Sequence, residues 1–416
     1  MDQSPSRPLS GITVLDLTIA LSGPYATLLL AGLGARIIKL ENPLSPDSSR
    51  NNAPYLGKNG PTLVRQNDDD ISVSALNRLR GKFGITLNLK HPESRAVYTD
   101  LVKRADVVFE NFSGGTLDRL GVGYDFVHEI NPRTVYCALT GFGSDAVNET
   151  GTGKAFDTII QAMSGFMYTS GEPDEAPVRA GVPFADMITA LFAVIGVLGA
   201  LRTAEKTGRG QFVDVSMLGA LTSLVASEPF DVLERLGVPF RTGATMPRLA
   251  PFGIYRAQDG FVAICAPTDA FANGLFEGMG RSDLKKDPRF LSRDLRVSNV
   301  AEIDRIVEDW TSELPLKELL GILTKAGVPS AEVRDPHSSV RDPIVVERRE
   351  TMPLEHPKFG RVGDVYGTGV PIRFSEAKTD LDQPPPELGQ HNDYVYGELL
   401  GYSSERIAEL REKGII

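Results

Sequence analysis

One carboxylate in the sequence stands where both catalysis and folding can use it. Asp186 lies in the segment GVPFADMITALFAVIGVLGAL, at the start of the most apolar helical run of the chain. An aspartate there can cap the helix by accepting hydrogen bonds from the exposed N–H groups of the first turn. The positive end of a helix also favours an ionised carboxylate, which can attack an acyl carbon. The residues alone leave the cap and the nucleophile open.

Two other segments resemble nucleotide-binding motifs, and each lacks a required part. A β-α-β opening ends in Glu41, where dinucleotide enzymes place a ribose-binding carboxylate, but the first turn, TIALSGPYAT, lacks three spaced glycines. Residues 151–154 (GTGK) resemble the end of a P-loop, yet Asn148 replaces an earlier glycine and Ala155 replaces the Ser or Thr. Lys154 can still meet a phosphate or carboxylate as a point charge. Nucleotide-dependent chemistry is therefore disfavoured.

The spacing of histidines and cysteines predicts no metal site. None of the histidines is paired as H-x-x-x-H, and neither HExxH nor the elbow G-x-S-x-G occurs, which disfavours zinc peptidases and serine hydrolases. Cys137 and Cys265 lie in apolar strand-like runs, where a free thiol behaves as a small buried hydrophobe. The histidines are His91, His128, His337, His356 and His391.

Net charge and hydropathy limit the classes of binding partner that the sequence supports. The 416 residues carry a net charge of −10, so no basic track for nucleic acid or anionic lipid is expected. The N-terminal segment MDQSPSRPLSG lacks the apolar core of a signal peptide. The apolar run 187–201 is shorter than the roughly 18 residues of a membrane span, which favours a buried core helix. We expect a cytoplasmic protein without a membrane or nucleic-acid partner.

Strands and helices alternate through the first half of the chain. Such alternation predicts an α/β fold with a doubly wound, mainly parallel, Rossmann-like sheet. Strands are predicted over 11–16, 36–40, 86–90, 105–111, 134–142 and 212–217, and helices over 24–33, 92–104, 116–130, 156–168 and 185–206.

A change of pattern after the first half predicts a second domain. Residues 226–339 carry a new set of strands and helices with linkers, which we interpret as a smaller α/β domain. Residues 335–386 contain scattered Pro and Gly and suggest extended chain that returns to the first domain. The predicted division is a large domain of 1–225 and 340–416 and a small domain of 226–339.

An ordered series of motifs resembles the family III CoA-transferases, the group of formyl-CoA and carnitine CoA-transferases. The series includes GPYATLLLAGLGARIIKLE, GITLNLKHPE, ADVVFENFSGGTLDRLG, GVPFADMITALFAVIGVLGAL, KTGRGQFVDVSML and LGQHND, and it runs from about residue 9 to the C-terminus. The resemblance implies CoA transfer between an acyl-CoA and a free carboxylic acid, with no permanently bound cofactor. It also implies a homodimer of two interlocked, ring-like subunits whose large domain binds CoA.

The same resemblance assigns site residues. It makes Asp186 the nucleophile, which forms an anhydride and then a CoA thioester. The family arginine that touches the nucleotide end of CoA corresponds to Asn42, and Lys39, Arg50 or Lys82 are candidates to replace its charge. Backbone N–H groups near Asp186, or in the turns at Gly165 and Gly171, are candidates to hold the oxyanions. The implied CoA contacts are Leu21, Ser22, Leu87, Lys90, Asn111, Phe112, Arg119, Lys154, Phe156 and Asp157.

Two alternatives remain at the level of sequence. Acyl-CoA racemases share the fold, but their motif has a histidine before the first of two aspartates, where this chain has Phe156, which cannot relay a proton. A catalytically silent CoA-binding subunit of a heteromer is the second alternative, although such a subunit need not keep Asp186. Succinyl-CoA as the donor is an expectation from the family alone.

Overall fold

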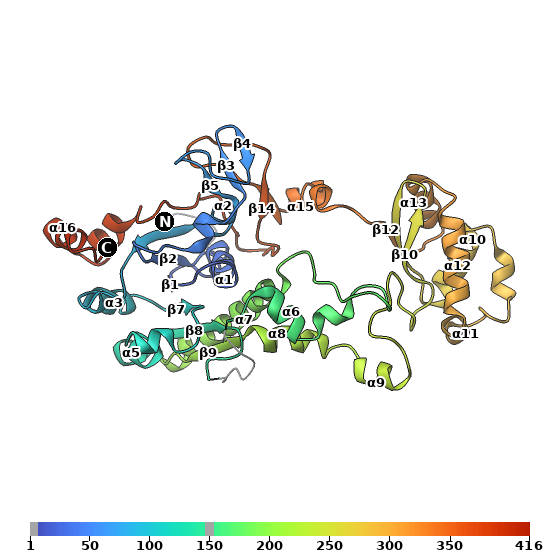
Figure 1. The fold of residues 1–416 in the computed structure, drawn as a ribbon, viewed down its shortest axis with the longest axis horizontal. Coiled ribbons are helices and arrows are strands. Elements are labelled where there is room, and N and C mark those ends of the chain that lie inside the picture. The colour runs from blue at the N-terminus through green and yellow to red at the C-terminus, as the bar shows by residue number, and fades with distance from the viewer. Residues whose placement is uncertain (1–6, 146–153) are drawn as a thin grey trace. The chain divides into compact units, whose positions relative to one another are not determined.

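The chain folds into two compact units in a computed structural model that describes residues 7–145 and 154–416. The larger unit comprises residues 1–164, 180–225 and 340–416, and the smaller unit comprises 165–179 and 226–339 (Figure 1).

A six-stranded parallel sheet forms the centre of the larger unit. The strands lie in the order β6-β2-β1-β7-β8-β9, and every neighbouring pair is parallel. In chain order this is 3-2-1-4-5-6, the arrangement of a doubly wound fold. The α/β class with a parallel central sheet is therefore confirmed. The strands are β1 (Thr13–Asp16), β2 (Arg36–Glu41), β6 (Lys82–Thr86), β7 (Val107–Glu110), β8 (Val135–Thr140) and β9 (Phe212–Ser216).

Helices cover both faces of this sheet. On one face, α3 (Ser94–Val102) and α5 (Tyr124–Ile130) pack with the C-terminal helix α16 (Ser404–Glu412) around buried residues such as Leu15 and Tyr98. On the other face, α1 (Ser22–Gly32) packs against α7 (Phe184–Thr207), and α7 also contacts β8, β9 and α8 (Met217–Val225). Because strand side chains alternate between faces, each face receives its own apolar set.

One face of the long helix α7 packs into the core of this unit. By length and composition alone it would pass as a membrane span, a test that buried core helices also meet. Its buried positions are mostly small, which lets the helix approach the sheet and α1 closely. They are Ala185, Thr189, Ala190, Ala193, Val194, Val197, Ala200, Leu201 and Ala204.

Three predicted elements differ from the structure. The strand predicted at 86–90 lies at Lys82–Thr86, because its pairing with β2 runs from Ile37↔Lys82 to Glu41↔Thr86 and the chain turns after it. The helix predicted at 116–130 is two helices, since Gly121 adopts a positive φ of 70°. The helix predicted at 156–168 ends at Met163, before Gly165 with a φ of 81°.

A segment that the sequence left unassigned forms a small layer beside the sheet. Residues 55–72 contain the antiparallel strands β3 (Tyr55–Gly57), β4 (Gly60–Thr62) and β5 (Ile71–Ser72), which lead into helix α2 (Val73–Arg78). Strands of two or three residues are too short to show alternation, so no periodic signal was available.

The smaller unit is an antiparallel sheet covered by helices. Strands β10 (Phe252–Ala257), β11 (Gly260–Cys265) and β12 (Ser330–Glu332) pack with α10 (Asp269–Gly278), α12 (Val300–Thr311) and α13 (Leu316–Lys325). Residues 165–179, which the sequence predicted in the large domain, belong to this unit. The Arg241 guanidinium holds them by donating to the carbonyls of Glu172, Pro173 and Glu175 at 3.1, 2.9 and 2.7 Å.

The C-terminal segment forms hydrogen bonds with β6, the strand at one edge of the sheet. The Gly84 N–H donates to His391 Nδ1 at 3.0 Å, and the Thr86 N–H donates to Asn392 Oδ1 at 2.9 Å. Asn392 also donates to the Thr86 hydroxyl at 2.8 Å, and the Tyr396 hydroxyl donates to the Thr86 carbonyl at 2.7 Å. The LGQHND motif thus satisfies backbone groups that an edge strand would otherwise leave unpaired.

Asn392→Ala is expected to lower the free energy of unfolding of the larger unit by about 2 kcal/mol, because it leaves a buried N–H group and hydroxyl of Thr86 without partners. Urea unfolding followed by circular dichroism measures the change. Thr86→Val removes the hydroxyl alone, and the double variant should lose less than the sum of the two. Strict additivity would contradict the proposed coupling.

Candidate active site

The turn after β1 lies at the carboxyl edge of the sheet, next to β7, where the strand order reverses. Ligands of doubly wound sheets bind in this position. Asn111, which follows β7, fixes the turn: its Oδ1 accepts the Ile19 N–H at 2.8 Å, and its Nδ2 donates to the Ile19 carbonyl at 2.9 Å. The segments that contain the predicted contacts Leu21, Ser22 and Phe112 are therefore brought together.

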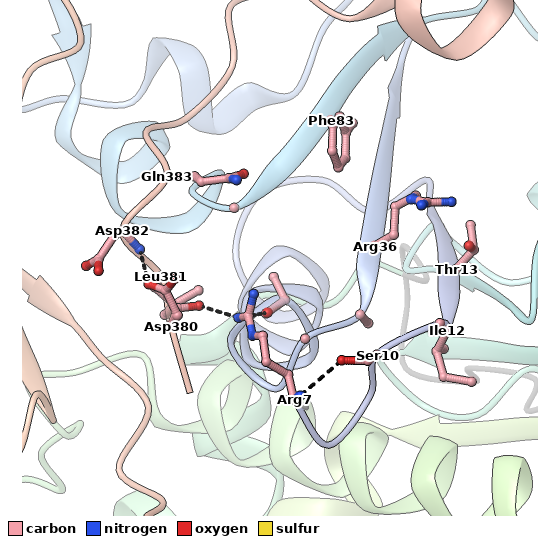
Figure 2. A pocket seen from close by; sticks show the side chains of 15 residues that line it. Arg7, Ser10, Ile12, Thr13, Arg36, Phe83, Asp380, Leu381, Asp382 and Gln383 are labelled. Atoms are coloured by element: carbon pink, nitrogen blue, oxygen red, sulfur yellow. Dashed lines mark hydrogen bonds between the residues drawn. The ribbon is translucent and has the colours of Figure 1, made fainter. Parts of the chain in front are cut away.

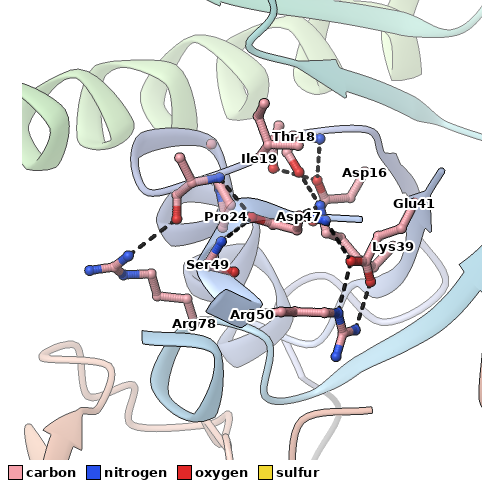
Figure 3. A network of polar contacts seen from close by, with 12 residues as sticks. Asp16, Thr18, Ile19, Pro24, Lys39, Glu41, Asp47, Ser49, Arg50 and Arg78 are labelled. Atoms are coloured by element: carbon pink, nitrogen blue, oxygen red, sulfur yellow. Dashed lines mark hydrogen bonds and ion pairs between the residues drawn. The ribbon is translucent and has the colours of Figure 1, made fainter. Parts of the chain in front are cut away.

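Ala20, in the middle of this turn, has a left-handed backbone with a φ of 67°. A residue with a Cβ pays about 1–2 kcal/mol for that conformation. Two hydrogen bonds hold it in place: the Ala20 N–H donates to Asp47 Oδ1 at 2.9 Å, and Arg78 Nη1 donates to the Ala20 carbonyl at 3.2 Å (Figure 3). This bend directs the chain into α1, whose first residue is Ser22.

A close contact at the second residue of α1 completes the turn. A Cβ at Gly23 would lie 2.3 Å from Thr18 Cβ. Only glycine therefore fits this position, although the spaced glycines of a dinucleotide motif are absent.

Buried ion pairs lie beneath the turn. Lys39 Nζ lies 3.2 Å from Asp47 Oδ2 with both side chains fully buried, and it also donates to the Thr18 carbonyl. Burial alone would lower the pKa of Lys39, but Asp16, Asp47 and other carboxylates raise it above its ordinary value. Lys82 pairs with the equally buried Asp16 at 3.0 Å.

The cations proposed to replace the family arginine already have partners. Lys39 and Lys82 are fully buried in the ion pairs with Asp47 and Asp16. Arg50 forms a two-pronged pair with Glu41, at 2.6 and 2.8 Å, and donates to the Pro386 carbonyl at 3.0 Å (Figure 3). Glu41 also accepts the Asp47 N–H at 3.0 Å, so it serves the network rather than a ribose.

Asp186 is the third residue of α7, and Pro183 occupies the cap position. The open N–H group of Ala185 donates to Asp157 Oδ1 at 2.9 Å. Gln161 Nε2 donates to the other oxygen of Asp157 at 2.8 Å and fixes that carboxylate. Asp157 therefore caps the helix, which leaves Asp186 available for another role.

Asp186 faces Ser22 and Arg78. The carboxylate is half-buried, and both the neighbouring Ser22 and the positive charge of Arg78 lower its pKa. Burial and the neighbouring Asp157 nevertheless raise the pKa of Asp186 to about 6. The helix dipole was expected to favour the ionised form, but burial outweighs it. At neutral pH the group is still mainly ionised, and it is more basic than an ordinary aspartate.

The remaining predicted contacts are scattered around this edge. The Leu87 side chain is fully buried in the core, so only its backbone can reach a ligand. Lys90 and Arg119 are exposed cations, as is Lys154, and the preceding residues of the P-loop-like segment, Gly151–Gly153, lie outside the described residues. Phe156 precedes α6 (Asp157–Met163) with its ring 69% exposed.

A buried carboxyl supports the turn that carries Asn111. Glu110, the last residue of β7, accepts the Phe112 N–H at 2.7 Å. Burial raises the pKa of Glu110 to about 7, assisted by Asp118 and Asp214, although the Phe112 N–H lowers it. The ENF triplet therefore positions the loop.

Sequence reasoning missed Asp47 and Arg78. Both come from the segment 45–80, where the motif resemblance is weakest. The only local signal is a capping pattern, since Asp47 also accepts the Ser49 N–H at 2.8 Å, and such a pattern indicates a turn rather than a site. Gly165 and Gly171, the candidates for oxyanion binding, belong to the smaller unit.

A cavity of about 290 Å³ lies at the other end of the strands and does not belong to this site (Figure 2). Thr13 and Arg36, which begin β1 and β2, line it. Arg7 Nη2 donates there to the carbonyls of Ala31 and Gly32 at 2.8 and 3.1 Å, so it caps the end of α1. Within residues 7–145 and 154–416, no group of three or more His, Cys, Asp or Glu side chains is arranged to hold a metal ion.

Comparison with known proteins agrees on one family. The model of "CoA-transferase family III" matches residues 9–392. The succinate–glutarate CoA-transferase of Agrobacterium fabrum is 33% identical over 96% of this chain and 98% of its own length. The acetyl-CoA:oxalate CoA-transferase of Acetobacter aceti is 35% identical over 93% of this chain and 94% of its own length. A crystal structure of a CaiB/BaiF family protein from Brucella suis has a TM-score of 0.78 and 32% identity, covering 94% of this chain and 99% of that one.

Proposed function

The chain belongs to CoA-transferase family III, and we propose that it moves CoA from an acyl-CoA to a free carboxylic acid through covalent intermediates on Asp186. The observation that carries the proposal is the position of this carboxylate. It is only partly buried, Asp157 rather than Asp186 accepts the open N–H group at the start of α7, and the neighbouring Ser22 favours its ionised form. A raised pKa makes it a better nucleophile while it remains mainly ionised at neutral pH.

The proposed reaction proceeds through an anhydride and a thioester. Asp186 attacks the acyl carbon of the donor, which forms an aspartyl anhydride and releases CoA as a thiolate. The thiolate then attacks the Asp186 carbonyl carbon, which forms the enzyme-CoA thioester and expels the donor acid as a carboxylate. The acceptor acid runs both steps in reverse. Covalent catalysis thus divides one difficult transfer between two weakly nucleophilic carboxylates into separate anhydride and thioester steps.

CoA is proposed to lie along the carboxyl edge of the sheet, in the larger unit. The first turn of α1 offers backbone N–H groups and the positive end of an eleven-residue helix. The exposed cations Lys90, Arg119 and Lys154 supply charge for phosphate groups.

The location of the protein in the cytoplasm stays a prediction from sequence.

The acids are proposed to be small carboxylates. Two relatives are named for succinate, glutarate and oxalate, which favours a dicarboxylic acid on at least one side of the reaction. A panel of acyl-CoA donors against free acids, read by mass spectrometry of the new thioesters, identifies the pair. Phe156 supports transfer over racemisation, because its ring carries no proton to relay.

The homodimer is proposed to use an exposed apolar stripe on α7. Leu191, Ile195 and Leu198 follow one helix face and are 42%, 64% and 37% exposed, and Ile159 and Met163 of α6 are also exposed. Apolar stripes of this kind mark interaction surfaces. That the two subunits interlock is taken from the family resemblance.

Ile195→Lys is expected to lower the fraction of dimer that forms on refolding, because interlocked subunits must assemble as they fold and the variant places a charge in the apolar stripe. Sedimentation of the refolded protein measures this fraction, and Thr203→Lys adds the same charge at another exposed position of α7 as a control. An unchanged dimer would place the interface elsewhere. A monomeric wild type would contradict the dimer itself.

Asp186→Asn is expected to abolish transfer while CoA affinity stays within about tenfold, because the loss falls on the covalent step. Burial raises the pKa of Asp186, so the ionised form costs stability above the ordinary aspartate pKa. The Asn variant should therefore resist urea at neutral pH as well as the wild type does. In the wild type, mass spectrometry after incubation with acyl-CoA and hydroxylamine should find the adduct on Asp186 alone. Loss of folding together with activity would instead indicate a structural role.

Formation of the adduct is expected to rise with pH through about 6 and to level off above it, because only the ionised Asp186 is nucleophilic. Rapid-quench mass spectrometry of a single turnover measures this profile. Ser22→Ala removes a hydrogen bond that lowers this pKa, so its inflection should move to higher pH. An inflection near the ordinary aspartate value of about 4 would contradict the proposed environment.

A further inference from the structure

Arg78 ends helix α2 and reaches the same turn that Asp186 contacts. Its Nη1 donates to the Ala20 carbonyl at 3.2 Å, and α1, which begins two residues further along at Ser22, packs against α7, the helix that carries Asp186. The two side chains therefore approach one short segment, residues 20–22. Arg78 is half-buried, so its guanidinium keeps access to solvent and to a ligand.

The carboxylates around Arg78 are not equivalent. Burial lowers the pKa of Arg78, and the negative charges of Asp186 and Asp47 both raise it against this lowering. Asp47 is already balanced by the fully buried Lys39, and it also accepts N–H groups from Ala20 and Ser49. Asp186 has no such lysine among its interactions. Arg78 is therefore the cation whose charge favours the ionised form of the nucleophile.

The other cations of this region have permanent partners. Lys39 pairs with Asp47, Lys82 with Asp16 and Arg50 with Glu41, and none of these carboxylates is consumed in the proposed reaction. Asp186 differs from these carboxylates, because acylation converts it into a neutral anhydride and then a neutral thioester. In those states Asp186 no longer contributes a negative charge near Arg78.

We propose that Arg78 binds the carboxylate of the free acid, both the acid that leaves after the first half-reaction and the acid that enters for the second. This inference rests on the proposed transfer through Asp186. It deepens that proposal by naming the residue that recognises the acid.

The charges balance at each step. When the thiolate attacks the Asp186 carbonyl carbon, the bond from that carbon to the bridging oxygen breaks, and the oxygen leaves with the donor acid. The negative charge of Asp186 thus passes to the CoA thiolate when the anhydride forms, and from the thiolate to the free acid in this step. Arginine suits this exchange, since it presents five N–H donors in a planar fork that matches a carboxylate. In the described residues, its one hydrogen bond to protein is to the Ala20 carbonyl.

The inference makes a binding prediction that needs no turnover. Asp186→Asn imitates the uncharged side chain of the thioester state and frees Arg78. Isothermal titration with glutarate should then give binding about tenfold tighter than in the wild type, as expected for one charge-assisted hydrogen-bonded contact that is partly exposed. Adding Arg78→Gln should remove the gain, whereas adding Arg78→Lys should retain part of it, because the charge remains.

Equal affinity in the wild type and Asp186→Asn overturns the inference, and so does a gain that survives Arg78→Gln. The first comparison leaves Arg78 in place, so it holds even if Arg78→Gln fails to fold. Circular dichroism checks folding in each variant.

Kinetics separate recognition of the acid from support of the turn. In otherwise wild-type enzyme, Arg78→Gln should raise the KM for the acceptor acid about tenfold while the KM for acyl-CoA changes by less than about threefold. A parallel rise of both values indicates that Arg78 only holds Ala20, and this overturns the inference. Failure of the proposed function has a different signature from failure of this inference. In that case the wild-type enzyme forms no adduct on Asp186.

Discussion

The turn after β1 keeps its shape because buried charges are balanced beneath it. Asp16, Glu41 and Asp47 face Lys82, Arg50 and Lys39, so three negative charges meet three positive ones. Removing one member of a buried pair leaves an uncompensated charge, which typically costs about 3–5 kcal/mol. The network reaches the turn through Asp47, which holds the left-handed Ala20. The position of Ser22, and through it the environment of Asp186, depends on this charge balance.

The environment of Asp186 combines opposing effects. Burial and the Asp157 carboxylate favour the neutral acid, whereas Ser22 and Arg78 favour the ionised form. The outcome is a pKa of about 6. A carboxylate with an ordinary pKa would be ionised at neutral pH but less nucleophilic, and one with a pKa well above 7 would be mostly protonated. The second aspartate thus serves two purposes, since Asp157 both caps α7 and tunes its neighbour.

The sequence predicted what periodicity and motifs can encode. Alternating strands and helices predicted the parallel sheet, and the apolar run after Asp186 predicted α7. Polar alternation in TLNLK was misleading, because only its first residue, Thr86, belongs to β6, and residues 87–90 lie after the strand. Lys39 and Lys82 were read as ligand cations, but sequence shows the charge of a side chain and not its burial. Arg78 was missed because its short helix has no recognisable period, and only the folded chain brings it to Ala20.

A transfer between two carboxylic acids has an electrostatic property that this arrangement suits. In the free enzyme the carboxylate charge is on Asp186, and in the thioester state of the proposed reaction it is on the free acid; at the anhydride stage between them it is on the CoA thiolate. A single cation can therefore stabilise both states without moving, provided that it contacts the region between them. Arg78 is held at that point by the Ala20 carbonyl, on a turn that the buried ion pairs keep rigid. Preorganised charge of this kind avoids the cost of reorienting solvent as the charge moves.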